Sequence, residues 1–309
     1  MGAEVSHYCQ RCPENTGWSP SESCGLIIRV TEILRRCVLF AEAGNAGRNG
    51  QLASTWLGQK NHSPMEKVSA KKPLGLIAGP SSEATILYRR QLDEQLFARF
   101  TDVGPAPLVT NELHGSAIES ALRRNDLTDA QRRAVAAAQQ CIAGGAEALM
   151  LGSSALHVAL DAVLKNVRVP VLSMVDAALD AIVASGLKRA ALLGTRFAVE
   201  NRYWQTQAQA RRLFLAAPVP DVMSRVGVII RDEICKGQLR EESRIELSHI
   251  CADFIGTGAD VIIVAAPELP LLLRERDSDL PLIHAMHLQV ANAIAWSTGN
   301  VRPGTSSSP

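Results

Sequence analysis

One stretch of the chain sets side chains that could exchange protons directly behind a short apolar run. In LMLGSSALH, residues 149–157, the apolar run ends in Ser153 and Ser154, and His157 follows closely. A serine hydroxyl needs a neighbouring base before it can act as a nucleophile or accept a proton. An imidazole is a competent base near neutral pH. These residue types predict a loop that holds a small molecule or moves a proton on it.

The residues around this loop alternate between short apolar runs and helical patterns. Residues 73–79 form an apolar run that ends in glycine, and residues 81–100 follow with apolar side chains at helical spacing. The same alternation continues from residue 106 to residue 297. Strands that alternate with helices build a parallel sheet covered on both faces, and ligands bind such sheets at the carboxyl ends of the strands. We therefore expect the functional side chains where the strands end.

A weak internal repeat indicates two similar halves. The run LMLG follows GGAEA, and the run VIIV follows GTGAD, so each strand comes after a glycine turn and a short acidic segment. Internal similarity of this kind marks related units, and a cleft between two units is a usual place for a small ligand. The fold class that we predict is α/β, with two similar parallel-sheet lobes and a shared interlobe cleft.

The composition narrows the classes of function. The 309-residue chain has a net charge of +1 at pH 7, whereas a nucleic-acid-binding protein usually carries a clear basic excess. No apolar run approaches the roughly 18 residues that a membrane span needs, and no signal-peptide pattern opens the sequence. The seven cysteines are unevenly spaced, which fits a reducing compartment better than a disulfide framework. We expect a cytoplasmic protein that binds neither nucleic acid nor membrane.

Residues 1–64 differ in composition from the rest of the chain. They contain four of the seven cysteines and two of the four tryptophans. Cys9 and Cys12 form a CxxC pair, but no second close pair follows, so a zinc site is not predicted. We expect this segment to be a disordered extension or a mis-started N-terminus, with Met65 as a natural start.

Four motifs occur in order along the chain, namely GLIAGPSSEATILYRRQL, LMLGSSALH, PVLSMVDAALDAI and VIIVAAPELPLLL. Together they resemble the aspartate/glutamate racemase superfamily, and the resemblance covers about residues 72–297. It implies a racemase or isomerase scaffold that transfers protons on a small amino acid or carboxylate without a cofactor, and it implies a homodimer. We expect a first lobe from residues 72–168 plus 284–300, and a second lobe from residues 169–283.

The chain departs from the family in the two loops that carry its catalytic cysteines. By this resemblance, the first family cysteine falls on Ser153 and the second on Ala266. A cysteine thiol has a reference pKa of about 8.5 that neighbours can lower, whereas a serine hydroxyl is far less acidic and alanine carries no exchangeable proton. Two-sided proton transfer between these two positions is therefore excluded, and we expect a non-cysteine mechanism.

The candidate site combines residues at strand ends with positions that match the family motifs. The candidate catalytic residues are Ser153, His157 and His284. The spacing of the histidines gives no metal-site pattern, so no metal ligand is assigned. The candidate substrate-binding residues are Ser81, Ser82, Asn111, Ser154, Ala155, Thr195, Ala266, Pro267 and Glu268.

Several interpretations of these residues stay open. The protein is a divergent enzyme on this scaffold, or a racemase that uses His157 and His284 on opposite sides of its substrate. Alternatively, it is a catalytically inactive protein that binds an amino acid or dicarboxylate through hydroxyls and backbone N–H groups at helix starts.

Structural roles compete with functional roles for single residues. His157 could orient its loop, Glu268 could stabilise a helix start, and Thr195 could cap a helix. We interpret the remaining cysteines of the core as packing or surface residues within helices: Cys141, Cys235 and Cys251.

Overall fold

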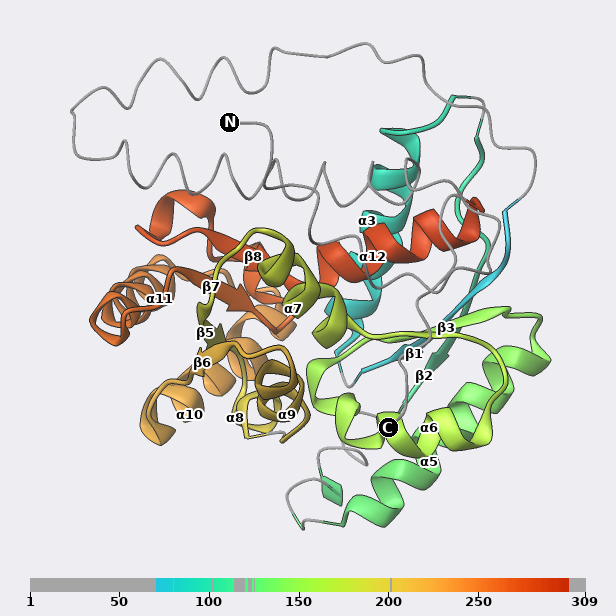
Figure 1. Cartoon of the computed structure of the whole chain (residues 1–309), viewed down its shortest axis with the longest axis horizontal. Coiled ribbons are helices and arrows are strands. Elements are labelled where there is room, and N and C mark those ends of the chain that lie inside the picture. The colour runs from blue at the N-terminus through green and yellow to red at the C-terminus, as the bar shows by residue number, and fades with distance from the viewer. Residues whose placement is uncertain are drawn as a thin grey trace, which may run out of the picture.

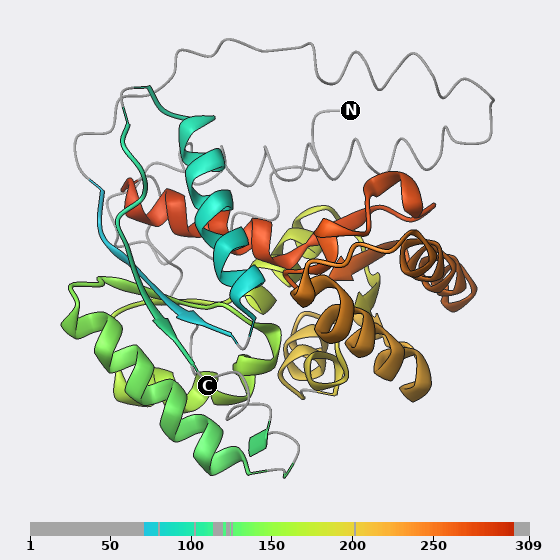
Figure 2. The same cartoon turned by 180° about the vertical axis from the view of Figure 1, so that it is seen from behind.

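The chain forms two parallel β-sheets with helices, arranged as two lobes side by side (Figure 1; Figure 2 shows the view from behind). The computed structural model describes residues 71–79, 81–101, 103–113, 120–121, 124, 126–200 and 202–299. The expectations for residues 1–64 lie outside the described residues. The predicted α/β class with two similar lobes is confirmed.

The first lobe is built on a four-stranded sheet in the order β2-β1-β3-β4. In register, Leu76 of β1 lies between Thr110 of β2 and Met150 of β3. Every residue of β1 and β3 is buried, as expected for a parallel sheet covered on both faces. The strands are β1 (Leu74–Ala78), β2 (Leu108–Glu112), β3 (Ala148–Leu151) and β4 (Val171–Leu172).

Helices cover both faces of this sheet (Figures 1 and 2). One face carries α5 (Leu127–Ala143) and α6 (Leu160–Asn166), and the other carries α3 (Ser82–Phe97) and α12 (Ala285–Ser297). The hydroxyl of Ser81 accepts a hydrogen bond from the backbone N–H of Ala84 at 3.2 Å, so Ser81 is the N-cap of α3. This cap fixes where the chain leaves the loop after β1.

The second lobe repeats the arrangement with strands in the order β6-β5-β7-β8. A π-helical turn (Ile229–Glu233) and a 3₁₀ turn (Ile234–Lys236) lie between two of its helices. The strands are β5 (Arg189–Leu193), β6 (Phe214–Ala216), β7 (Val261–Val264) and β8 (Leu282–His284). The helices are α8 (Arg196–Val199), α9 (Arg202–Ala210), α10 (Pro220–Val228) and α11 (Glu241–Asp253).

Two helices join the lobes into one core. Helix α12 packs against both α3 and α7 (Met174–Ala184). One continuous apolar cluster contains Leu76 of the first sheet, Ile263 of the second sheet and Val290 of α12. The shared core fixes the two sheets relative to each other, and with them the loops at their carboxyl ends.

The lobe boundaries differ from the expected ones at two strands. Strand β4 pairs with β3 in the first sheet, although it lies beyond residue 168. Strand β8 pairs with β7 in the second sheet and ends at His284. The short strand β6 was not anticipated, because three residues give too little apolar pattern to separate a strand from a loop.

Within the described ranges, no helix combines the length and the apolar character that crossing a membrane requires.

Candidate active site

A pocket of about 510 Å³ opens between the lobes where the strands end. Its wall includes Gly79 after β1, Gly152 after β3, Thr195 after β5 and Ala265 after β7. The predicted interlobe cleft is therefore present. Most of the candidate residues line it: Ser81, Ser82, Ser153, Ser154, Ala155, Thr195, Ala266, Pro267 and Glu268.

Glycines let the loops after β1 and β3 approach each other closely. A Cβ atom placed on Gly79 would lie 2.7 Å from the Cβ of Ser153. A Cβ atom placed on Gly152 would lie 3.1 Å from the carbonyl oxygen of Ile77. Both distances are shorter than ordinary contacts, so the two loops can lie this close only because glycine has no side chain. The close approach lets Ser81 and Ser153, which these loops carry, line the same pocket.

Trp204 of α9 connects the second lobe to the loop of the first lobe. Its indole Nε1–H donates a hydrogen bond to Oγ of Ser154 at 2.6 Å, and both side chains are buried. A buried indole N–H normally requires such an acceptor. Ser154 therefore fixes the position of α9 as well as lining the pocket.

His157 lies behind the pocket loop and not in its wall. Its Nδ1 lies 3.1 Å from the carbonyl oxygen of Ser153. Since a carbonyl oxygen only accepts, Nδ1 must carry the proton. Burial lowers the pKa of His157 to about 4, although the Ser153 carbonyl and the charge of Asp176 act in the opposite direction. The geometry therefore favours a neutral imidazole that orients Ser153, and a catalytic role stays a prediction.

The aromatic ring of Tyr203 covers His157 from the side of the second lobe. The two ring centroids are 5.8 Å apart, and the Tyr203 hydroxyl donates a hydrogen bond to Oδ2 of Asp176 at 3.0 Å. Within the described part of the chain, Nε2 of His157 is buried without a hydrogen-bond partner. The ring is thus shielded from the pocket.

His284 and Asn111 also lie away from the pocket wall. Nε2 of His284 is 3.1 Å from Oε1 of Glu275, and its ring packs against that of His287 with centroids 4.9 Å apart. Asn111, on the edge strand β2, donates a hydrogen bond to the side chain of Gln140. The structure therefore does not bring His157 and His284 together across a ligand.

Glu268 is a buried carboxyl group in the pocket wall, with 7% of its surface exposed. Burial raises its pKa, the charge of Glu83 adds to the rise, and a hydrogen bond from Ser81 opposes it. The 3₁₀ turn that follows Glu268 spans only Leu269–Leu271, so there is little helix for its charge to stabilise. The site therefore contains a carboxyl group that retains its proton to a higher pH than usual.

The pocket residues that the sequence reasoning missed include Arg196, Arg231 and Cys235. Arg196 follows Thr195, whose hydroxyl caps α8 by accepting the N–H of Ala198 at 3.3 Å, and its place beside a strand end could have marked it. Cys235 and Arg231 are far from any strand end in sequence. They reach the pocket only because the chain between α10 and α11 folds back over it.

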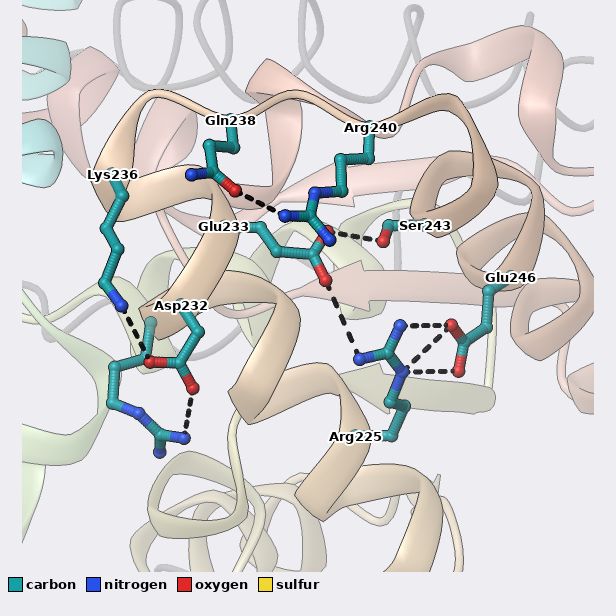
Figure 3. Close-up of polar contacts among 9 residues, drawn as sticks. Arg225, Asp232, Glu233, Lys236, Gln238, Arg240, Ser243 and Glu246 are labelled. Atoms are coloured by element: carbon teal, nitrogen blue, oxygen red, sulfur yellow. Dashed lines mark hydrogen bonds and ion pairs between the residues drawn. The ribbon is translucent and has the colours of Figure 1, made fainter.

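A polar network holds this returning segment in place (Figure 3). The buried carboxylate of Glu233 accepts a hydrogen bond from Ser243 of α11 and pairs with Arg225 of α10 at 3.7 Å. Arg225 also pairs with Glu246 at 2.8 Å. Figure 3 shows Glu233 between the two helices, so the turn that carries Cys235 is fixed to both.

The sequence profile described as Asp/Glu/Hydantoin racemase matches residues 76–293, a range that contains every residue lining the pocket. The chain belongs to this family. Ser153 and Ala266, which the resemblance matches to the cysteines of the Asp/Glu/Hydantoin racemase family, line the pocket in this member.

Solved structures with the same fold include members of this family. A candidate Asp/Glu racemase from Yersinia pestis is 25% identical, with a TM-score of 0.66 over 73% of this chain and 99% of that chain. An aspartate racemase homologue from Pyrococcus horikoshii is 20% identical, with a TM-score of 0.64 over 74% and 99%. Glutamate racemase from Francisella tularensis, solved with D-glutamate, is 12% identical, with a TM-score of 0.56 over 77% and 86%. The last two likenesses concern the fold alone.

Proposed function

We propose that this protein catalyses cofactor-independent proton transfer on a small amino acid or carboxylate in the interlobe pocket, with Glu268 as the acid–base group. The observation that carries the proposal is the buried carboxyl of Glu268, next but one to Ala266 in the pocket wall. Among the described residues that line the pocket, it is the one with a carboxyl side chain.

The raised pKa of Glu268 suits this role. An acid–base group transfers protons most effectively when its pKa lies near the working pH. Enzymes raise the pKa of a glutamate by burial, which disfavours the charged form, and burial is the largest cause of the shift at Glu268. The carboxyl can therefore give a proton to a carbanion and take one from a carbon acid.

The rest of the wall suits an anionic substrate. Arg196 and Arg231 line the pocket, each already paired with a neighbouring carboxylate, and guanidinium groups also recognise the carboxylate of a substrate. The loop after β1 leads into the amino end of the long helix α3, where backbone N–H groups favour anions. The hydroxyls of Ser82 and Ser153 add neutral hydrogen-bonding groups to the wall.

The two predicted histidines, His157 and His284, do not have the same role in this proposal. His157 acts on the substrate only through the loop that it orients, because it does not line the pocket. We assign no step to His284. The expectations of a cytoplasmic location and a homodimer remain part of the proposal.

Incubation of the full chain in heavy water tests this function. The substrates offered are both enantiomers of aspartate and glutamate together with malate and 2-methylsuccinate, and deuterium at the α-carbon is followed by proton NMR. We expect loss of the α-proton signal for at least one of these acids. If no acid exchanges while thermal-shift measurements show that one binds, the protein is a ligand-binding member of the family and the proposed catalysis is wrong.

A further inference from the structure

A thiol and a carboxyl group meet at one hydroxyl in this pocket. The thiol of Cys235, carried by the 3₁₀ turn after the π-helical turn, donates a hydrogen bond to Oγ of Ser81 at 3.3 Å. Ser81 comes from the first lobe and Cys235 from the second, so this contact spans the pocket that both residues line.

The hydrogen bonds of Ser81 define a direction for proton movement. Its oxygen accepts the thiol proton of Cys235 and the backbone N–H of Ala84, the latter at 3.2 Å. A hydroxyl has two acceptor sites and one proton to donate. With both acceptor sites used, the hydroxyl proton remains to be donated. Glu268 lines the same pocket, and the Ser81 hydroxyl acts to lower the pKa of its carboxyl group.

We propose that Cys235 is the second proton-transferring group of the site, and that it exchanges protons with Glu268 through the hydroxyl of Ser81. This inference rests on the proposed function, since it supplies a partner for Glu268 in the same reaction. It places a thiol in the pocket at a position remote in sequence from Ser153 and Ala266. The expectation of a mechanism without any cysteine is then replaced by a mechanism without the two loop cysteines.

Protons and charges balance over the whole cycle. At the start Cys235 holds its thiol proton and Glu268 is a carboxylate. The thiol proton moves to Oγ of Ser81 as the Ser81 hydroxyl proton moves to Glu268, which leaves a thiolate and a carboxylic acid. The thiolate removes the α-proton, and the electron pair of the C–H bond stays on the substrate carbon. Glu268 then gives its proton to that carbon, which restores the starting state.

The charges around the relay come from several elements. Glu83 of α3 adds a negative charge near Glu268, and Tyr88 of the same helix is close enough to be influenced by the Glu268 charge. Arg196 and Arg231 also line the pocket, where each is ion-paired with a neighbouring carboxylate, Glu200 and Asp232 respectively. Burial raises the pKa of Glu268 above the ordinary glutamate value of about 4.3, which makes its carboxyl a better acceptor for a proton.

The first arm of the test needs no substrate. The full chain is alkylated with iodoacetamide between pH 6 and pH 10, and the modification of Cys235 is measured by peptide mass spectrometry. We expect Glu268→Gln to lower the midpoint of Cys235 alkylation by about one pH unit or more, because a carboxylate no longer faces the thiolate. The control Glu147→Gln removes an exposed carboxylate immediately before β3 and is expected to leave the midpoint unchanged. Equal midpoints in wild type and Glu268→Gln overturn the proton sharing.

The second arm measures α-proton exchange with the acid that the wild type turns over. Cys235→Ala is expected to lower the rate by about 100-fold or more, whereas Cys251→Ala, a buried position in α11 away from the pocket, keeps it. Ser81→Thr retains both the cap and the hydroxyl and should keep most of the rate. Ser81→Asn retains the cap but has no hydroxyl, and this variant should lose most of the exchange rate.

The two arms separate failure of the inference from failure of the proposed function. If wild type exchanges protons and Cys235→Ala does so within about threefold, Glu268 acts without this thiol and the inference is wrong, while the proposed function stands. If wild type exchanges none of the acids, the proposed function is wrong, and the alkylation midpoints alone decide whether Cys235 and Glu268 share a proton.

Discussion

Trp204 in the second lobe donates its indole proton to the hydroxyl of Ser154 in the first lobe, at 2.6 Å and out of contact with water. The neighbouring Ser153 makes no capping hydrogen bond through its side chain. Two adjacent serines of one loop therefore differ in role. Ser154 contributes to the association of the lobes, and Ser153 presents its side chain to the pocket.

Replacement of Ser154 tests this division directly. We expect Ser154→Ala to lower the free energy of unfolding by about 1–3 kcal/mol, because the buried indole N–H loses its acceptor. Ser153→Ala, the matched control in the same loop, should change it by less than about 0.5 kcal/mol. Urea titration measures both. Equal effects of the two substitutions would show that the contact to Trp204 does not stabilise the protein.

The buried imidazole of His157 should make stability depend on pH. Folding holds the pKa of His157 at about 4, whereas an unfolded histidine titrates near 6.5, so the unfolded chain binds more protons between these values. The stabilisation is complete above pH 6.5 and is lost as the pH falls to about 4, by on the order of 3 kcal/mol. His157→Gln should remove this part of the loss.

The contribution of His157 is obtained by comparing the pH-dependent loss of stability between the wild type and its variants. This comparison is needed because His287 has a similarly lowered pKa and titrates in all of these proteins. Urea midpoints are measured from pH 7.5 to pH 5 for wild type, His157→Gln and His249→Gln, the last at an exposed position. If His157→Gln loses as much stability as the wild type when the pH falls from 7.5 to 5, the imidazole of His157 is not buried in its neutral form.

Glu268 should influence stability in the opposite pH direction. Its pKa is raised in the folded protein, so the folded state binds more protons than the unfolded state above pH 4.5. The stability that this carboxyl contributes is present below its unfolded pKa and is lost as the pH rises through the folded value. We expect the melting temperature of Glu268→Gln to be close to that of the wild type at pH 4.5 and higher than that of the wild type at pH 8. A melting difference that stays constant with pH would count against a buried protonatable carboxyl.

The close approach at Gly79 should tolerate no side chain. Gly79→Ala places a methyl group 2.7 Å from the Cβ of Ser153, and we expect it to destabilise the protein by about 1–3 kcal/mol. Gly227→Ala is the contrasting variant, because its new Cβ meets nothing within 4 Å in α10 and alanine favours a helix by about 1 kcal/mol. The melting temperature should fall for Gly79→Ala and rise for Gly227→Ala. An unchanged melting temperature for Gly79→Ala would show that the two loops can separate.

The fold could be predicted from the sequence because it depends on long patterns. The apolar runs of β1, β3, β5 and β7 are each followed by a loop, and the alternation with helices implies parallel sheets whose loops meet at one edge. The same logic placed Ser81, Ser153, Thr195 and Glu268 in one pocket.

The parts that could not be predicted depend on side-chain direction and on distant chain segments. His157 follows Ser153 closely, but one turn of 3₁₀ helix directs it under Tyr203 and away from the pocket. The sequence pattern predicts a packing or surface role for Cys235 within a helix, yet the turns after α10 carry it to Ser81, 154 positions earlier in the sequence. Neither outcome follows from spacing alone.

The central claim is that Glu268 transfers protons in this pocket, and the most direct measurement is the rate of α-deuterium incorporation in heavy water. The full-length wild type and Glu268→Gln are compared with the same acid at the same pH, after their folding has been verified by melting curves. We predict that wild type incorporates deuterium and that Glu268→Gln does so at least about 100-fold more slowly. Equal rates in the two proteins would contradict the claim.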